Sequence, residues 1–593
     1  MTNSIEELTA AVAGQTVASE FLRTSAAHAD RVALRERGPD DSWLEWTFAE
    51  YAAEVAEVAA GLRAAGVGQG DRVVLMMRNV VAFHIVDMAA VFCGATPISI
   101  YNSSAPEQVA YLAGHCEAKV AVVEDDGFAE RFTKVRNDLP ALTEVINLAQ
   151  GGREALAAHG SVYLAESAGS VTPDMLATVI YTSGTTGPPK GVMLSHFNVA
   201  YTAESLKRSF GGELDLGGKR LVSYLPMAHI AERMTSHYSQ AIQGYEVSSC
   251  PDPGLLAPYL KDVRPNIMFG VPRVWEKLHA GVSAALAADP EKKAKFDEGM
   301  AAAIPIALDR AWGRATDEQE ATWDFLQSFA FGPIKELIGL DQIEFAITGA
   351  APIPPELLSW YQGLGVPLSE IYGMSESSGP MTWTPHRIKP GTVGPAIPGC
   401  EVALAPDGEV VCRGGNVFLG YLNDQAKTDE ALVDGWLHTG DIGELDEDGY
   451  LRIVDRKKEL IITAGGKNIS PANLEAALKM IPLVGQACAI GDQRPFVAAL
   501  VVLDAEVAPA WAAANDLGGL SLVELAEHPD VVAQIERDLE QVMAPFNKAE
   551  RVKKVRVLGV EWLPDSDELT PTSKLKRRGI HARYAEHIEA LYA

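Results

Sequence analysis

A loop rich in glycine and hydroxyl side chains is the first candidate for chemistry in this chain. The stretch YTSGTTGPPKGVMLSH runs from Tyr181 to His196. Glycines expose backbone N–H groups and hydroxyls donate to phosphate oxygens, so this composition indicates a phosphate-binding loop. The Walker A pattern does not fit, because from Gly184 onward Pro189 replaces its second glycine and Gly191 replaces its Ser/Thr. A P-loop NTPase is therefore excluded, while a passive surface turn stays open for the loop taken alone.

The residues around this loop predict alternating helices and buried strands. One face of an amphipathic helix is formed by Tyr51, Val55, Val58, Ala59, Leu62 and Ala65, and the helix stops at Gly66. Apolar strands are expected in 71–77, 118–125 and 176–183. The loop therefore leaves the end of a strand at 177–181, which is where α/β folds bind ligands.

The rest of the chain divides into unlike segments. Short strands are predicted within 220–226, 266–272 and 343–350, and an Ala-rich helical segment within 277–340. From about Gly399 short strands and turns predict a mostly β module. A boundary is expected at the charged stretch 455–459, because a helix, two strands and a helical region follow it.

The composition predicts a globular enzyme and limits the kinds of partner that it can bind. The chain has 593 residues, is 47% hydrophobic and 22% charged, and carries a formal net charge of -29. This charge argues against general binding to nucleic acid or anionic membranes. No signal peptide, membrane span or closely spaced cysteine pair is recognisable. A soluble cytoplasmic enzyme is expected, with transient contact at a membrane surface left open.

Five further stretches accompany the loop in a fixed order. They are SYLPMAHIAER (223–233), AITGAAPIP (346–354), EIYGMSES (370–377), DGWLHTGDIGELDEDGYLRIVDRKKELIITAGGKNISP (434–471) and LTPTSKLKRR (569–578). With the loop, they resemble the adenylate-forming superfamily of acyl-CoA synthetases, luciferases and adenylation domains. The resemblance covers about 170–580 and is weaker before it. The long fourth stretch and the phrase FGVPRVWEKL look most like long-chain fatty acyl-CoA ligases, including the mycobacterial type.

The resemblance implies an α/β fold with two domains. Residues 1–455 would form a large N-terminal domain of α/β subdomains with a small β-barrel-like part, which binds ATP and fatty acid. Residues 456–593 would form a small, mobile α+β domain that hinges at Lys458. In two half-reactions, a fatty acid and ATP would give acyl-AMP and pyrophosphate, and coenzyme A would then displace AMP. No enzyme nucleophile is needed, because the protein only has to hold two anions together and exclude water.

The resemblance assigns residues to the phosphates of ATP and to the metal ion. Lys190 and Glu376 would hold the phosphates and Mg²⁺ respectively, and Ser375 replaces the threonine usual before this glutamate. The residues assigned to the β- and γ-phosphates are Thr182, Ser183, Gly184, Thr185, Thr186, Gly187 and Lys190. Taken alone, Glu376 would read as a surface carboxylate in a glycine-rich turn.

The resemblance also assigns residues to the purine and the ribose of the nucleoside. Gly349, Ala350 and Ala351 would admit the purine close to the backbone, with Tyr372 stacked on it and Gly373 beside it. Asp441 and Arg456 would hold the ribose hydroxyls. The alternatives are a half-buried core tyrosine for Tyr372, a turn cap for Asp441 and a solvated charge for Arg456.

The resemblance also implies which residues lie at the reacting groups of the substrates. His229 would lie where the acyl carboxylate meets the α-phosphate and would gate the acid and thiol channels. The alternatives are a general base and, more commonly for a lone histidine, a core residue. Lys574 would bridge the same two anions as a compact charge. Here Ser573 replaces the usual glycine, and the following Lys576, Arg577 and Arg578 fit a solvated basic face better. Gly465 and Gly466 would let pantetheine pass close to the backbone.

The resemblance also predicts where the acyl chain binds, and two alternative functions stay open beside the ligase hypothesis. FGVPRVWEKL and the helix after His229 are expected to line an apolar acyl tunnel. An acyl-AMP ligase that serves a carrier protein is one alternative, against which AGGKN argues. A non-catalytic nucleotide- or acyl-binding protein is the other, against which the presence of Glu376 and Lys574 argues. Luciferase-like oxidation shares the motifs and has no separate support.

Overall fold

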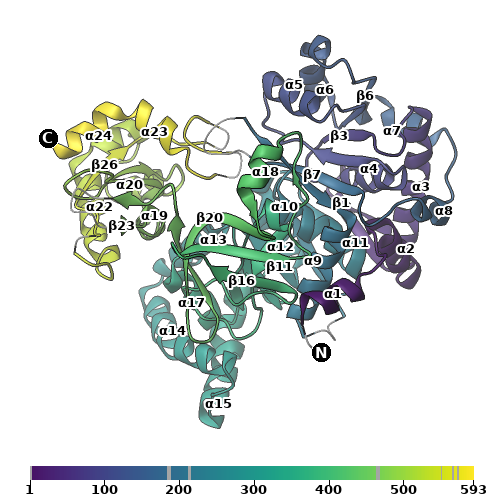
Figure 1. Ribbon diagram of the computed structural model, residues 1–593. Coiled ribbons are helices and arrows are strands. Elements are labelled where there is room, and N and C mark those ends of the chain that lie inside the picture. Colours follow the sequence, from purple (N-terminus) through teal and green to yellow (C-terminus); the bar gives the residue numbers. More distant parts are fainter. Residues whose placement is uncertain are drawn as a thin grey trace.

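A computed structural model of the chain describes residues 3–182, 188–211, 215–462, 468–548, 550–563, 566–570 and 573–593. It confirms a mixed α/β fold with a large N-terminal part and a smaller C-terminal part, drawn mostly in yellow, which lies at one side of the N-terminal part in Figure 1. The five loop residues 183–187 and the pair Gly465 and Gly466 fall outside the described residues.

The first subdomain is built on a parallel sheet of order β4-β3-β5-β6. The predicted helix is α3 (Phe48–Ala64), which starts at a capping box between Thr47 and Glu50 and buries the predicted apolar face. The strands are β3 (Arg72–Met76), β4 (Thr96–Ser99), β5 (Val120–Val123) and β6 (Glu144–Asn147). Helix α1 (Ile5–Ala11) precedes this subdomain in the chain. The helices of the subdomain are α2 (Val17–Ala27), α4 (Val81–Phe92), α5 (Pro106–His115), α6 (Asp126–Lys134), α7 (Gly152–Ala157) and α8 (Leu164–Gly169).

A seven-stranded sheet of order β13-β12-β11-β9-β10-β1-β2 forms the second subdomain. Only the β1–β2 pair is antiparallel. The carboxyl ends of the parallel strands therefore share one edge, where ligands bind in such sheets. The strands are β1 (Val32–Arg37), β2 (Trp43–Thr47), β9 (Arg220–Ser223), β10 (Glu246–Ser249), β11 (Ile267–Gly270), β12 (Phe345–Thr348) and β13 (Leu368–Glu370).

The helix that follows His229 contains an unpredicted π-helical stretch. It begins as α10 (Ile230–Glu232), continues as a π-helix (Arg233–Tyr238) and ends as α11 (Ser239–Gln243) at Gly244, whose φ is +81°. Such wide turns are rare and occur often at functional sites. Helix α9 (His196–Ser209) packs against this helix, and α12 (Leu256–Val263) packs against β9 in the same subdomain.

The predicted helical segment is confirmed and projects from the body in Figure 1. A second core cluster, which includes Trp275, Met300 and Tyr361, joins these helices to the sheet. The helices are α13 (Pro272–Ala287), α14 (Pro290–Ala311), α15 (Asp317–Leu326), α16 (Gly332–Ile338) and α17 (Pro355–Leu364).

The strand that leads into the loop differs from the expectation for a parallel α/β sheet. Strand β7 (Leu176–Thr182) pairs antiparallel with β8 (Lys190–Ser195), which pairs with β18 (Gly420–Tyr421). The expectation rested on a buried apolar run, and such a run does not tell whether its neighbours are parallel. The consequence is that both ends of the loop are held by one hairpin.

The predicted β module is an antiparallel sheet around the long strand β20 (Trp436–Leu445). Strand β20 pairs with β17 along one edge and with β19 and β21 along the other. The other elements of this region are β14 (Tyr372–Met374), β15 (Gly379–Thr382), β16 (Cys400–Leu404), β17 (Glu409–Gly414), α18 (Gln425–Ala431), β19 (Leu432–Val433) and β21 (Leu451–Arg456).

The C-terminal part has cores of its own. Two clusters of buried residues lie wholly within the part of the chain from Ile461 onward. Met480 of this part also packs against the second core cluster, which includes Trp275. The strands are β22 (Ile461–Ile462), β23 (Asn468–Ile469), β24 (Val484–Ile490), β25 (Ala498–Leu503) and β26 (Lys554–Leu558). The helices are α19 (Pro471–Leu478), α20 (Val507–Ala514), α21 (Leu522–Glu527), α22 (Pro529–Val542), α23 (Arg577–Arg583) and α24 (Ala585–Tyr592).

Candidate active site

A large cavity lies between the two parts of the chain. Its volume is about 2140 Å³, which exceeds the roughly 300–1,000 Å³ of an ordinary small-molecule site. Most of the described candidates line it, from both parts of the chain. These are Thr182, Lys190, His229, Ala350, Ala351, Tyr372, Gly373, Ser375, Glu376, Asp441, Arg456, Lys458 and Lys574.

Lys190 and Glu376 are connected through a tyrosine that the sequence analysis missed. Tyr421 donates its hydroxyl hydrogen to Glu376 Oε1 at 2.7 Å, and Lys190 Nζ lies 4.0 Å from the centre of the Tyr421 ring. Burial, and then the Glu376 charge, raise the pKa of Tyr421 well above its usual range. Glu376 is only 6% exposed, so its carboxylate is held in one orientation toward the cavity.

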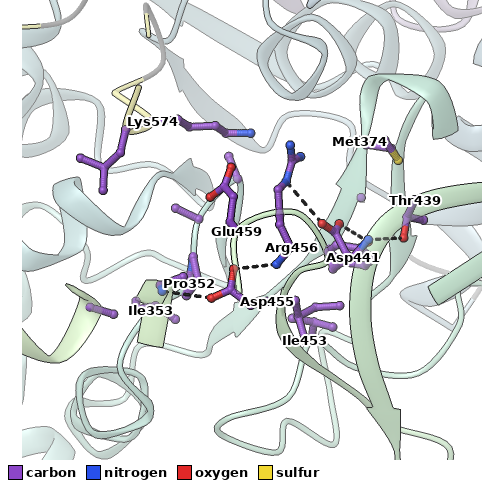
Figure 2. A pocket seen from close by; sticks show the side chains of 18 of the residues that line it. Pro352, Ile353, Met374, Thr439, Asp441, Ile453, Asp455, Arg456, Glu459 and Lys574 are labelled. Atoms are coloured by element: carbon purple, nitrogen blue, oxygen red, sulfur yellow. Dashed lines mark hydrogen bonds and ion pairs between the residues drawn. The ribbon is translucent and has the colours of Figure 1, made fainter. Parts of the chain in front are cut away.

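Asp441 and its partners form a second cluster. Tyr372 donates to Asp441 Oδ2 at 2.6 Å, and Arg456 Nε lies 3.3 Å from Asp441 Oδ1. Neighbouring strands supply these partners, because Asp441 on β20 is paired in register with Arg456 on β21. Figure 2 shows Arg456 extending over Asp441 into the cavity. Burial raises the pKa of Asp441, while the Arg456 charge and the Tyr372 hydrogen bond act against that rise.

Lys574 reaches this cluster from the C-terminal part. In Figure 2 its side chain points toward the space occupied by Arg456 and Glu459. Lys574 stays accessible to water in the cleft, yet the surrounding protein displaces much of its hydration. This loss of water, followed by the Arg456 charge, lowers the pKa of Lys574, while Asp441 and Glu376 oppose the shift. The structure therefore holds the C-terminal part in an orientation that presents Lys574 to the cavity.

His229 lines the same cavity at the start of α10. Its Nδ1 accepts the backbone N–H of Ala231 at 3.2 Å, so it caps the helix while its ring stays half-buried. Burial, and then the charge of Lys574, lower the pKa of His229 to about 3. The imidazole is therefore neutral at physiological pH, which suits a gate better than a charged group.

The predicted purine pocket is partly assembled. Ala350 and Ala351 line the cavity, and Ala350 adopts a left-handed φ of 69°, which is uncommon without glycine. Gly349 is not among the lining residues. A Cβ at this position would lie 2.8 Å from Ile371 Cγ2, so there is no room for a side chain. Its contact with a purine stays a prediction. Glu370, which the sequence analysis did not single out, also lines the cavity, and burial raises its pKa to about 8.

The stretch around Lys458 joins the two parts of the chain. Lys458 is exposed in a turn after β21. Beside it, Asp455 accepts hydrogen bonds from Ser470 Oγ at 2.6 Å and from the Ala472 backbone at 3.1 Å. Asp455 thus stabilises the start of α19 across the junction.

The phrase FGVPRVWEKL does not line a tunnel as predicted. Within it, Phe269 alone lines the cavity, and Trp275 is buried in the second core cluster. The polar face of α13 contacts the C-terminal part instead. Arg273 pairs with Asp504, Glu276 lies 3.3 Å from Lys479, and Lys277 lies 2.8 Å from Glu506. The partners of α13 lie in distant segments of the chain, so the phrase alone did not reveal them.

The basic run after Lys574 is not a uniformly solvated face. Arg577 makes hydrogen-bonded ion pairs with both oxygens of Glu475, at 2.6 and 2.9 Å, and lies 3.1 Å from Glu459. Lys576 Nζ donates to the Ser566 carbonyl at 2.7 Å. Arg578 is exposed, as the sequence predicted. Arg577 was misjudged because its acidic partners lie about a hundred residues away in the sequence.

The donor groups in the cavity decide which kind of metal site the protein could form. Among the described residues, no group of three His, Cys, Asp or Glu side chains is arranged to hold a metal by itself. Magnesium often takes only one or two carboxylates together with substrate phosphates. One buried carboxylate in the cavity, Glu376, fits that second arrangement.

No helix in the described ranges combines the length and the apolar character that a crossing of the bilayer requires. The six cysteines are all buried free thiols.

Comparison with known families and proteins identifies the relatives of this chain. The AMP-binding enzyme family matches residues 21–422, and the AMP-binding enzyme C-terminal domain matches residues 458–593. The chain belongs to the AMP-binding enzymes. The described cavity therefore lies between the two regions that define this family.

Two bacterial AMP-binding enzymes illustrate the relationship. The long-chain-fatty-acid–CoA ligase FadD15 of Mycobacterium bovis is 36% identical over 585 residues, which cover 94% of each chain. The putative fatty-acid–CoA ligase fadD11 of Mycobacterium tuberculosis is 42% identical over 432 residues, which cover 72% of this chain and 75% of the relative.

A solved structure of the same fold comes from a carboxylic acid reductase. The A domain of that enzyme from Segniliparus rugosus, in complex with AMP and a co-purified carboxylic acid, aligns with a TM-score of 0.73. It is 20% identical, and the alignment covers 99% of this AMP-binding enzyme and 96% of the A domain.

Proposed function

We propose that the protein is an ATP-dependent long-chain fatty acid–CoA ligase. The observation that carries the proposal is the meeting of Lys574 with Asp441, Arg456 and Glu376 around one cavity, although these residues come from distant parts of the chain. The relative FadD15, which covers 94% of this chain, is named as a long-chain-fatty-acid–CoA ligase, and fadD11 is named as a putative fatty-acid–CoA ligase. ATP, a long-chain fatty acid and coenzyme A are the proposed substrates.

In the first half-reaction the fatty acid carboxylate attacks the α-phosphate of ATP. This forms an acyl–phosphate bond and releases pyrophosphate. Lys574 would hold both anions, and its position in the cavity beside Arg456 supports this role. Asp441 has one oxygen on Tyr372 and the other near Arg456, and it would accept from the ribose hydroxyls. Thr182, Lys190 and the loop residues 183–187 would hold the phosphates.

Magnesium fits this site through Glu376. When bound, the ion would neutralise phosphate charge, with Glu376 as its protein ligand and Ser375 beside it. The Tyr421 hydroxyl would keep the Glu376 carboxylate oriented, since it already donates to one carboxylate oxygen.

In the second half-reaction the thiol of coenzyme A attacks the acyl carbonyl and AMP leaves. We propose that residues 456–593 turn as a domain about Lys458 between the two steps. The turn would withdraw Lys574 and bring Gly465 and Gly466 to the pantetheine arm. The contacts of α13 with Asp504, Lys479 and Glu506 would have to open, because they belong to the orientation that presents Lys574.

The alternatives are weaker on specific grounds. An acyl-AMP ligase that passes the acyl group to a carrier protein would share the first half-reaction. A non-catalytic binding protein has no need of a lysine presented to a cavity beside Glu376 and Asp441. Substrates such as ATP and coenzyme A fit a cytoplasmic location, with transient visits to membrane surfaces to collect fatty acid.

The dependence of activity on the length of the fatty acid is the first test of the proposed function. The cavity extends past His229 to apolar residues that include Leu206, Phe210 and Phe269. Each buried methylene contributes about 0.8 kcal/mol, or roughly fourfold in affinity. We therefore expect kcat/KM to rise several-fold per carbon across saturated acids until the tunnel is full. Turnover of acetate or benzoate above that of palmitate, measured by release of pyrophosphate, would show the substrate assignment to be wrong.

A further inference from the structure

Helix α13 of the N-terminal part makes two ion pairs to the C-terminal part in which the carboxylate is buried. Arg273 pairs with Asp504, whose side chain is 8% exposed. Glu276, at 5% exposed, lies 3.3 Å from Lys479 Nζ and 3.6 Å from Arg273 Nη1. Neither oxygen of Glu276 has a regular hydrogen bond among the described residues, so these two cations balance its charge. Buried carboxylates of this kind depend on their ionic partners.

Asp504 is held firmly on the side of the C-terminal part. It accepts the backbone N–H groups of Glu506 and Val507, both at 2.9 Å, which fixes the turn before α20. Burial acts to raise the pKa of Asp504, but these hydrogen bonds and the Arg273 charge outweigh it and lower the pKa below its usual value. Asp504 is therefore a charged partner in a fixed position for Arg273.

Helix α19 connects these contacts to the reacting lysine. Its start is held by Asp455, and Lys479 at its other end lies against α13. Between them, Glu475 on α19 binds Arg577 through both carboxylate oxygens, at 2.6 and 2.9 Å. Arg577 follows Lys574 by three residues. Figure 1 shows α19 next to α13, where the two parts meet, so the contact of α19 with α13 is linked to the position of Lys574.

We propose that Arg273 is a positioning residue for adenylation. Its ion pair would hold the docked orientation, in which α13 contacts the C-terminal part and Lys574 is presented to the cavity. Arg273 and Glu276 are not among the described residues that line the cavity, so Arg273 acts on the reaction through Lys574. The strength of this contact sets the balance between the two half-reactions. The inference rests on the proposed function, since it explains how that site is held in its first step.

The variant Arg273→Gln shows how large the effect should be. It removes a cation and leaves two carboxylates, Asp504 and Glu276, in the docked contact, where an uncompensated charge is unfavourable. A turn away from α13 would return both carboxylates to water. A hydrogen bond to a charged group is worth at least about a factor of ten in an equilibrium constant. The equilibrium should therefore shift about tenfold or more away from the docked orientation.

The test measures both half-reactions on the full-length protein. Adenylation is followed as pyrophosphate release from palmitate, ATP and Mg²⁺, and thioester formation is followed from palmitoyl-AMP and coenzyme A. Each rate depends on the population of its own orientation, so the ratio of the two rates follows the equilibrium between the orientations. In Arg273→Gln the ratio of thioester formation to adenylation should rise about tenfold or more. Arg273→Lys keeps the charge and should stay much closer to the wild-type ratio.

Arg264→Gln is the matched control. Arg264 pairs with Asp341, whose side chain is also 8% exposed, and both residues belong to the N-terminal part. This variant loses an equivalent ion pair without touching the contact between the two parts. Its ratio of rates should equal that of the wild type, even where thermal unfolding shows a loss of stability.

A covalent link between the two parts separates positioning from a general structural role. Lys277 and Glu506 form an exposed pair across the same contact, at 2.8 Å, and such a pair contributes little by itself. Lys277→Cys with Glu506→Cys introduces two exposed thiols for a short bismaleimide, whereas the six native cysteines are buried. The link replaces the ion pair, so linked protein with and without Arg273→Gln should adenylate palmitate at the same rate.

The possible outcomes distinguish this inference from the proposed function. An unchanged ratio in Arg273→Gln, an equal change in Arg264→Gln, or slower adenylation by linked Arg273→Gln protein would overturn the inference and leave the ligase assignment intact. Absence of pyrophosphate release by the wild-type protein with palmitate would overturn the proposed function and this inference together.

Discussion

Lys574→Ala should lower the rate of acyl-adenylate formation by roughly 10²–10³, the usual effect of removing one electrostatic contact to a transition state. The structure presents this lysine to the cavity beside Arg456, with Asp441 and Glu376 close enough to influence its pKa. Its charge would lie between two anions in a cleft where water is partly displaced, so their attraction is stronger than in bulk water. The measurement is pyrophosphate release with palmitate and ATP.

The second half-reaction separates this role from a general structural one. If the C-terminal part turns after adenylation, Lys574 leaves the cavity, and Lys574→Ala supplied with palmitoyl-AMP and coenzyme A should form thioester at nearly the normal rate. Lys553→Ala is a suitable control, because Lys553 is exposed in the same domain and away from the cavity. Lys576 is a poorer control than its position suggests, since it donates to the Ser566 carbonyl. Equal losses in both half-reactions, with unchanged circular dichroism, would contradict the turning-domain account.

Glu376→Gln should reduce adenylation by at least about 10² while the fold stays intact. Glutamine retains an oxygen that can accept from Tyr421, so the local packing survives. It lacks the negative charge that a hard cation requires. The measurement is the rate of pyrophosphate release as a function of Mg²⁺ concentration, with thermal unfolding as the check on the fold.

Glu370 offers a comparison within the same cavity. Burial raises its pKa to about 8, so at pH 7 most of the molecules carry a neutral carboxyl group at this position. Glu370→Gln exchanges one neutral group for another and should cost much less than Glu376→Gln, without changing the dependence on Mg²⁺. Wild-type rates and an unchanged Mg²⁺ dependence in Glu376→Gln would remove Glu376 from the site.

Much of the fold was predictable because apolar spacing is a local signal. The face of α3 and the strands β3, β5 and β7 follow from such spacing. The partners of those strands were less predictable, as the antiparallel hairpin of β7 and β8 shows. A buried apolar run fits either kind of pairing, and the pairing depends on distant segments.

The same limit applies to the site. Short motifs located Glu376, Asp441 and Lys574, which do line one cavity. They did not reveal Tyr421, which holds Glu376 from 45 residues away. Nor did they reveal the ion pairs that Arg577 makes with Glu475 across 102 residues. These contacts exist only once two segments pack together, so a local pattern carries no trace of them.

The π-helical stretch after His229 was also beyond the sequence. Its residues are compatible with an ordinary α-helix, and the wider turn arises where Arg233 and His237 are both paired with the buried Asp87 on α4. Burying such charges is costly unless they are paired, so the surrounding core fixes this geometry.

The most direct test of the proposed function is a product analysis with palmitate, ATP, Mg²⁺ and coenzyme A. The ligase account predicts that palmitoyl-CoA, AMP and pyrophosphate appear in equal amounts, and that omission of coenzyme A leaves palmitoyl-AMP on the protein. Palmitoyl-AMP that accumulates in the presence of coenzyme A without thioester, or the absence of any ATP cleavage with palmitate, would contradict it.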